Sequence, residues 1–211
     1  MSRGAEPASA KASQSASRAE IPLFPLNTVL FPGGPLPLRI FEARYMDMAK
    51  ECLKSGGPFG ICLIKEGAEV GTPAVPEPVG CLARIAEADM EELGILKVKA
   101  EGLERFRIVS TETGTNGLIV GEIERLAAEE EMADTPGLDE SAEFLRKAII
   151  GIGEDRFGAP HRFDDASWVS FRLAEILPLR NDVKQKLLEL RDASVRLAIL
   201  HRFLRQQKLI A

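Results

Sequence analysis

The sequence is poor in the residues from which metal sites and disulfide frameworks are built. It has two histidines, and its three cysteines, Cys52, Cys62 and Cys81, are an odd number with apolar neighbours. Zinc-binding cysteines come in closely spaced pairs, and a disulfide framework needs an even number. The cysteines therefore predict buried, reduced thiols in a cytoplasmic protein. We expect no metal site and no cofactor.

The sequence also lacks long apolar runs and an excess of positive charge. No run approaches the roughly 18 apolar residues that a membrane-spanning helix needs, so we expect no association with a membrane. The net charge of −5 and the pI near 5.3 argue against a protein that neutralises many phosphates. Nucleic acid is therefore disfavoured as a partner.

The first 20 residues lack the side chains that could anchor them to a core. They contain no aromatic and no branched aliphatic residue, so their burial cannot offset the entropy lost on ordering. Residues 1–20 are predicted to be a disordered tail, and the missing apolar stretch argues against a secretory signal. An organelle transit peptide is the alternative, which Glu6 and Glu20 disfavour.

Motifs for catalysis are missing as well. No GxxxxGK[ST] run for nucleotide phosphates occurs, and Gly151 and Gly153 lack the third glycine of a dinucleotide-binding loop. His161 lies near Asp164 and Asp165, but a loop that leads into a capped helix explains those aspartates without catalysis. We therefore expect a non-enzyme with no catalytic residues. An enzyme whose site leaves no sequence signal is the alternative.

A joint between a strand and a helix dominates what the sequence does contain. Leu36, Leu38 and Ile40 alternate with other residues at the period of a half-buried strand. The period then becomes helical, with one apolar stripe formed by Phe41, Tyr45, Met48, Ala49 and Cys52. Glycine and proline at 56–58 end this helix, and Arg44 is expected on its solvent side.

Most of the first 126 residues follow a strand pattern. Asn116-Gly117 is a strong hairpin signal between the last two expected strands. Strands are expected at 21–30, 36–40, 59–65, 79–86, 95–101, 104–110 and 118–125, of which the first suits an edge or an extended arm because it carries two prolines. About six short strands and one early helix predict a small mixed barrel or curled sheet.

The rest of the chain changes character. Residues 127–137, with the acidic run Glu129 to Glu131, are predicted to be a solvated linker. Helical periods follow from 138 onward, with Asp164 or Asp165, Asn181 and Asp192 as expected N-caps. The fold class is thus α+β. Its expected parts are the tail (1–20), a β-rich part (21–126), the linker (127–137) and a helical bundle (138–211).

Four stretches in order carry a resemblance to a known family. They are residues 27–32 with 36–45, 79–85, 98–108, and 171–179 with 185–190. Together they resemble the LON substrate-binding domain, the N-terminal domain of ATP-dependent Lon proteases, which also occurs as a free-standing protein. The resemblance implies a PUA-like pseudo-barrel and a role in binding polypeptides, with protein quality control as the setting and a protease or chaperone as a further partner. It implies no chemistry, since Lon enzymes carry their ATPase and protease activities in separate domains.

A polypeptide ligand requires an apolar groove with a charged rim. The best candidate in the sequence is the proline-stiffened turn at 31–35 beside the start of the early helix. The candidate peptide-binding residues are Phe31, Pro32, Phe41, Glu42, Arg44 and Tyr45. Arg44 is expected to be the most exposed of them. Core packing is the alternative for Phe41 and Tyr45, and an ion pair with a nearby arginine is the alternative for Glu42.

A second function remains open, in which a PUA-like sheet binds RNA or a small ligand. Lys97, Lys99, Arg105 and Arg107 alternate along expected strands and would place four cations on outward faces. Aromatic residues do not alternate with them on the same face, so a solvated sheet face is the favoured interpretation.

Overall fold

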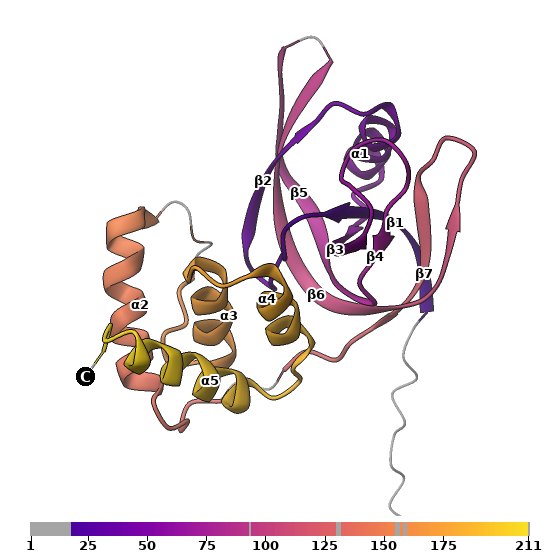
Figure 1. The fold of residues 1–211 in the computed structure, drawn as a ribbon. Helices are drawn as coiled ribbons and strands as arrows, with labels where there is room; N and C mark the ends of the chain where they lie inside the picture. Colours follow the sequence, from indigo (N-terminus) through magenta and orange to yellow (C-terminus); the bar gives the residue numbers. More distant parts are fainter. Residues whose placement is uncertain (1–17, 93, 130–131, 155–156, 158–159, 211) are drawn as a thin grey trace, which may run out of the picture.

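The computed structural model describes residues 18–210, apart from 93, 130–131, 155–156 and 158–159. In Figure 1 a strongly curled sheet with one helix lies beside a group of four helices. The β-rich part contains β1 (Arg18–Leu26), β2 (Pro35–Ile40), α1 (Ala43–Ser55), β3 (Phe59–Glu66), β4 (Val75–Pro76), β5 (Val79–Glu92), β6 (Ile95–Thr113) and β7 (Ile119–Arg125). The helical part contains α2 (Leu138–Ile152), α3 (Ala166–Ile176), α4 (Asn181–Glu189) and α5 (Ala193–Gln206).

The sheet closes on itself because β1 has a partner on each side. The strand order is β1-β7-β6-β5-β3-β4, β2 pairs with β6, and β1 also pairs in parallel with β3. Every other strand pair is antiparallel among the described residues. The result is the mixed pseudo-barrel that the sequence predicts, with seven strands. The expected strands 95–101 and 104–110 form one long strand, β6, that bends around the barrel.

The bend of β6 receives the turn at 31–35. The Gly33 N–H donates to the Gly102 carbonyl at 2.8 Å, and the Gly102 N–H donates to the Gly34 carbonyl at 2.8 Å. A Cβ atom at Gly102 would overlap the Phe31 carbonyl oxygen, so only glycine allows this approach. The turn is thus fixed against the sheet by backbone contacts.

The other three helices of this part pack around α3, which is buried on nearly every side from Ala166 to Ala174. The Asp165 carboxylate accepts a hydrogen bond from the Ser167 N–H, and that of Asp192 accepts from Ser194 and Val195, so both are N-caps as predicted. The expected cap Asn181 is wrong, because α4 starts after Arg180 without a side-chain cap. The Asn181 side chain instead donates to the Asn27 carbonyl at 2.5 Å.

The apolar core is continuous between the two parts. The largest cluster contains the helical core and also Val29, Phe31, Leu63 and Val79 of the β-rich part. A second cluster lies between α1 and the sheet, and a third fills the barrel around Phe106. The three cysteines are free and buried, as predicted for the thiols themselves.

The first residues of β1 correct the predicted extent of the tail. Arg18 to Glu20 pair with Glu124 to Glu122 of β7, so β1 includes residues that were predicted to belong to the tail. Residues 1–17 lie outside the described part of the chain. Within that part, no helix is long and apolar enough to cross a membrane.

Candidate functional site

The predicted peptide-binding rim is divided between two places in the structure. The turn at 31–35 packs against α3, and the Phe31 and Phe171 rings lie 5.8 Å apart. Phe31 is fully buried, so it is a core residue and cannot contact a ligand at the surface. The start of α1 packs against the hairpin between β6 and β7. A single rim made of both segments therefore does not exist.

Arg44 is buried, which corrects the expectation that it is the most exposed residue of the rim. Only 7% of its surface is accessible. Its guanidinium pairs with the Glu42 carboxylate at 2.9 Å, donates to the Gly117 carbonyl at 3.1 Å and lies 4.7 Å from the centre of the Tyr45 ring. The side chain turns inward because the hairpin tip covers the helix face that the sequence pattern assigned to solvent.

The other residues of the predicted rim divide between core and surface. Tyr45 is buried and stacks on Phe24 with ring centres 4.0 Å apart, so the core-packing alternative holds for it. Phe41 is 56% exposed and precedes the helix. The Glu42 carboxylate pairs with an arginine, which is the alternative to peptide binding that the sequence allowed for this residue. Pro32 remains partly accessible and lies at a different cavity.

That cavity is a cleft of about 240 Å³ between the sheet and α3. Its apolar wall consists of residues from the turn, β6, the segment after β7, and α3. These residues are Pro32, Leu103, Leu126, Ala127, Trp168 and Phe171. Glu104 and Arg162 lie at the same cleft and carry opposite charges, and each pairs with a neighbour, Arg125 and Asp165 respectively. The cleft is therefore apolar with a charge-balanced edge.

The turn at the cleft is held from below by Arg172 of α3. Its Nη2 donates to the Pro32 carbonyl at 2.8 Å, and its Nε lies 3.1 Å from a Glu175 carboxylate oxygen. Burial lowers the pKa of Arg172 and raises the pKa of Glu175, while the opposite charge of each partner counteracts both shifts. The Arg172–Glu175 pair thus anchors the backbone of the turn to α3.

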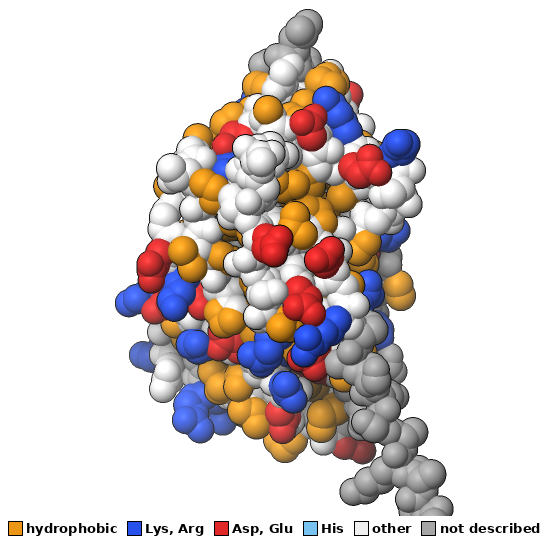
Figure 2. Space-filling model, turned by 90° about the vertical axis from the view of Figure 1, so that its right-hand side faces the viewer, with side chains coloured by type: hydrophobic (Ala, Val, Ile, Leu, Met, Phe, Trp, Pro, Cys, Tyr) orange, Lys and Arg blue, Asp and Glu red, His pale blue; other side chains and the backbone are white. Residues whose placement is uncertain are grey.

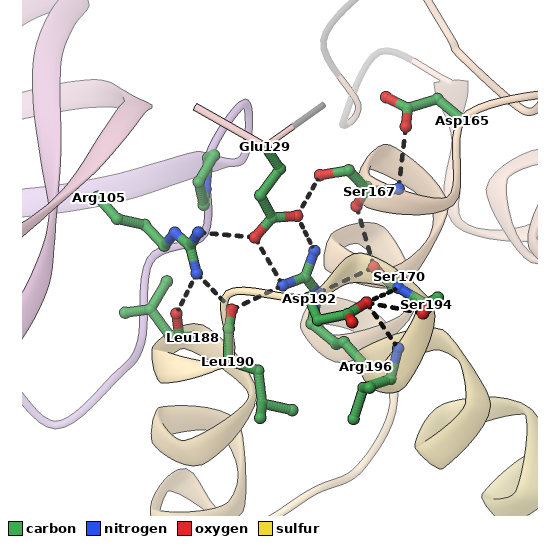
Figure 3. A network of polar contacts seen from close by, with 12 residues as sticks. Arg105, Glu129, Asp165, Ser167, Ser170, Leu188, Leu190, Asp192, Ser194 and Arg196 are labelled. Atoms are coloured by element: carbon green, nitrogen blue, oxygen red, sulfur yellow. Dashed lines mark hydrogen bonds and ion pairs between the residues drawn. The ribbon is translucent and has the colours of Figure 1, made fainter. Parts of the chain in front are cut away.

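A buried network of charges, drawn in Figure 3, contributes Arg105 and Glu129 to the lining of the cleft. The Glu129 carboxylate lies 2.7 Å from Arg105 Nη2 and 2.9 Å from Arg196 Nη1, and it accepts a hydrogen bond from the Ser167 hydroxyl at 2.6 Å. Burial lowers the pKa of Arg105, and the Glu129 carboxylate opposes that shift. We call Arg105, Glu129 and Arg196 the latch.

The latch overturns two expectations drawn from the sequence. Glu129 belongs to the segment expected to be a solvated linker, yet its side chain is 7% exposed. Glu130 and Glu131 lie outside the described residues. Arg105 does point away from the barrel interior, because Phe106 fills that interior, but the helical part covers this face and leaves Arg105 4% exposed. Arg105 is therefore not available on the sheet surface as one of the four cations predicted for RNA binding.

Two arginines face one carboxylate in the latch, and the end of α4 supplies the missing negative potential. Arg105 Nη1 donates to the Leu188 carbonyl at 2.9 Å and also to the Leu190 carbonyl. Arg196 Nη1 donates to the Leu190 carbonyl at 3.1 Å. Carbonyls at a helix C-terminus carry partial negative charge, so they stabilise the second guanidinium. The latch joins β6, the 126–129 segment and three helices.

The comparisons with known proteins agree with this architecture. The family model for the ATP-dependent protease La (LON) substrate-binding domain matches residues 20–206. The chain belongs to the LON substrate-binding domain family. A Lon N-terminal domain protein from Xanthomonas campestris is 34% identical, with a TM-score of 0.73 over 86% of this chain and 96% of that chain. The N-terminal domain of a Mycobacterium avium complex Lon protease is 19% identical with a TM-score of 0.64, over 86% of this chain and 96% of that one, and so supports the fold.

The aromatic wall of the cleft in this LON domain is the feature that sequence reading missed. Trp168, the one tryptophan of the chain, is 8% exposed. Its ring centre lies 5.2 Å from that of Phe163 and 5.6 Å from that of His161. His161 is thus part of an aromatic cluster beside the cleft. The sequence does contain a signal for this wall. Trp168 and Phe171 are three residues apart, so they lie on the same side of a helix.

Cys62 and Cys81 lie in the core of the LON domain and are not part of the cleft wall. Burial raises the pKa of the Cys62 and Cys81 thiols, which keeps them protonated and unreactive. No group of three or more histidine, cysteine, aspartate or glutamate side chains in the described ranges could hold a metal ion. The arrangement suits the capture of an apolar side chain.

Proposed function

We propose that this LON domain binds unfolded polypeptide segments at the cleft between the 31–35 turn and α3. The observation that supports this proposal is the apolar wall formed by Pro32, Leu103, Leu126 and Trp168, with the latch behind it. A volume of about 240 Å³ accommodates one bulky apolar side chain, while the extended chain on either side stays at the surface. Family membership supports a polypeptide as the ligand.

The proposed role is recognition without turnover, in protein quality control. The matched family is a substrate-binding domain, which supports a non-enzyme that presents clients to a protease or chaperone partner. A cytoplasmic location is part of this proposal, since three free buried cysteines suit a reducing compartment. We expect weak binding, in the micromolar range, because one small pocket offers few anchors and association itself costs several kcal/mol.

The experiment uses Trp168 as a reporter inside the site. A labelled unfolded peptide with a central leucine or phenylalanine is titrated with the protein, and anisotropy is compared with the change in tryptophan fluorescence. Leu126→Asn removes apolar wall at nearly constant size and should weaken binding about tenfold or more. Leu53→Asn on the exposed side of α1 is the matched control, because Leu53 is 49% exposed and is not part of the cleft wall.

Three outcomes decide the proposal. Loss of affinity in Leu126→Asn, with unchanged binding in Leu53→Asn and similar melts for both, would support it. Equal affinity in all three proteins would remove the cleft from the site. Binding of RNA with a steep loss of affinity on adding salt would favour the alternative function. The face shown in Figure 2 gives that alternative little support, because acidic, basic and apolar side chains are interspersed over it.

A further inference from the structure

Strand β5 extends well beyond the strand that covers its outer edge. β3 pairs with β5 only at Cys81 to Ala83, whereas β5 continues to Glu92 and remains paired with β6. In Figure 1 the β5–β6 hairpin projects at the top of the view, and β2 pairs with it on the β6 side. The side chains from Ala86 to Met90 are all exposed. Residues 84–92 make backbone hydrogen bonds only within the sheet. Among the described residues, no turn or loop bonds to their backbone.

The prolines of β2 establish which backbone groups of β5 point outward. Pro37 lies opposite Lys99 and has no N–H, so this pair of β2 and β6 is not hydrogen-bonded. Lys99 must then direct its N–H and carbonyl toward β5, where it pairs with Glu87. Backbone directions alternate along a strand. The N–H and carbonyl of Ala88 therefore point to the open edge.

The opposite side of this ribbon is closed to an additional strand. Pro35 and Pro37 occupy outward positions of β2, so that edge lacks two of the donors that a neighbouring strand would need. β5 contains no proline between Arg84 and Met90. The hairpin thus presents one protected edge and one edge with unpaired backbone donors and acceptors.

The charges beside the open edge indicate what kind of strand it would accept. Glu87 and Asp89 of β5 lie opposite Lys99 and Lys97 of β6, so acidic and basic residues alternate from strand to strand. Directly opposed side chains of opposite charge stabilise neighbouring strands. The Glu87 carboxylate pairs with the Lys99 ammonium at 3.1 Å, and an added strand with basic residues on this face would continue the alternation on the open side of Glu87 and Asp89. On the other face, the small side chain of Ala88 leaves room for an apolar residue.

We propose that the β5 edge from Arg84 to Met90 binds an extended polypeptide segment as an added strand, with a preference for alternating basic and apolar residues. The inference rests on the proposed function, because it assumes an unfolded polypeptide client. It adds recognition of the main chain, which every unfolded segment offers whatever its sequence.

The test uses a labelled peptide of four Lys-Val repeats with blocked ends. Its control is the same peptide N-methylated at alternate residues, which keeps the side chains and removes the donors on one edge. On the protein, Ala88→Pro removes the outward N–H without touching the bonds to β6, and Ala88→Ser retains that N–H and a small side chain. We expect about tenfold weaker binding for Ala88→Pro and for the methylated peptide, and near wild-type binding for Ala88→Ser.

Each contrary result has its own meaning. Equal binding of both peptides, or unchanged binding by Ala88→Pro, would overturn the edge site and leave the cleft to be judged by Leu126→Asn. Failure of the wild type to bind either this peptide or the cleft peptide would overturn both proposals. Sedimentation that shows a wild-type dimer and a monomeric Ala88→Pro variant would show that the edge pairs with a second copy, and would also overturn the inference.

Discussion

At the scale of single residues, buried arginines connect distant parts of this LON domain. Four arginines are buried among the described residues. Each one contacts both a carboxylate and a backbone carbonyl, and at least one of these two partners lies in a remote segment. They are Arg44, Arg105, Arg172 and Arg196. A planar guanidinium has five donors spread over three nitrogens in a fixed arrangement, so it can donate to a carboxylate and to a carbonyl in different directions, whereas the three donors of lysine all lie on one nitrogen.

The burial of Arg44 leads to a prediction about stability. Arg44→Glu would place a carboxylate beside Glu42 and leave the Gly117 carbonyl without its donor. We expect a loss of about 3 kcal/mol or more in the free energy of unfolding, because one partner of a buried pair is left uncompensated. Urea denaturation would measure it, with Lys50→Glu on the exposed face of α1 as the control. A variant as stable as wild type would show that the pair contributes nothing.

The sequence could not have revealed this environment. A helical pattern locates a residue relative to its own helix, and Arg44 does lie off the apolar stripe of α1. Its burial depends on the hairpin tip at Gly117, which is 73 positions away in the chain. For Arg105, the strand alternation correctly predicted that the side chain points out of the barrel. It could not predict that the helices cover this face. Buried charges are set by tertiary neighbours, so local patterns do not report them.

At the scale of elements, the sequence predicted two helix caps and a hairpin turn correctly, but it did not predict that β6 is one uninterrupted strand. Asp165 and Asp192 cap their helices because their carboxylates reach the first free N–H groups, a purely local effect. The Asn116-Gly117 hairpin also forms as predicted, between Thr113 and Ile119. The expected strands 95–101 and 104–110 are one strand, β6, and Gly102 between them allows the close approach of the 31–35 turn. The requirement for glycine at this position thus comes from a segment that is distant in the sequence.

The Asp192 cap predicts a dependence of stability on pH. Its hydrogen bond with the Ser194 side chain, followed by those from backbone N–H groups, lowers the pKa of Asp192. A carboxyl whose pKa is lower in the folded state contributes stability above its unfolded pKa of about 3.9, and this contribution disappears as the pH falls through the folded pKa. Asp192→Ala should therefore lower Tm at neutral pH, and the difference from wild type should shrink in acid.

The measurement is a series of thermal melts from neutral pH down to about pH 2, across the window set by the lowered pKa. Asp47→Ala is the control, because Asp47 lies on an exposed helix face and pairs only with Lys50 among the contacts seen here. A difference in Tm that stays constant over the whole pH range would show that the Asp192 carboxylate does not act through its charge.

At the scale of the whole molecule, the division into a β-rich and a helical part remains a prediction, and many contacts cross it. Gln185 of α4 donates to the Val79 carbonyl at 3.0 Å, Arg172 holds the Pro32 carbonyl, and the shared apolar cluster contains Phe31 and Phe171. The cleft lies along this boundary, so its shape depends on how firmly the helices are held to the sheet. The latch is the polar part of that attachment.

The last prediction concerns the cooperativity of the two parts. Glu129→Ala would leave Arg105 and Arg196 buried without their carboxylate, which we expect to cost about 3–5 kcal/mol. Hydrogen exchange, measured segment by segment, should give β6 and α3 the same opening free energy in wild type, because one cooperative unit contains both. In Glu129→Ala, α3 should open at a lower free energy than β6.

Glu143→Ala, which removes only exposed ion pairs on α2, should leave both opening free energies unchanged. Equal losses in β6 and α3 would show that the latch stabilises the whole fold without coupling its parts, and separate opening in wild type would show that the parts are independent units.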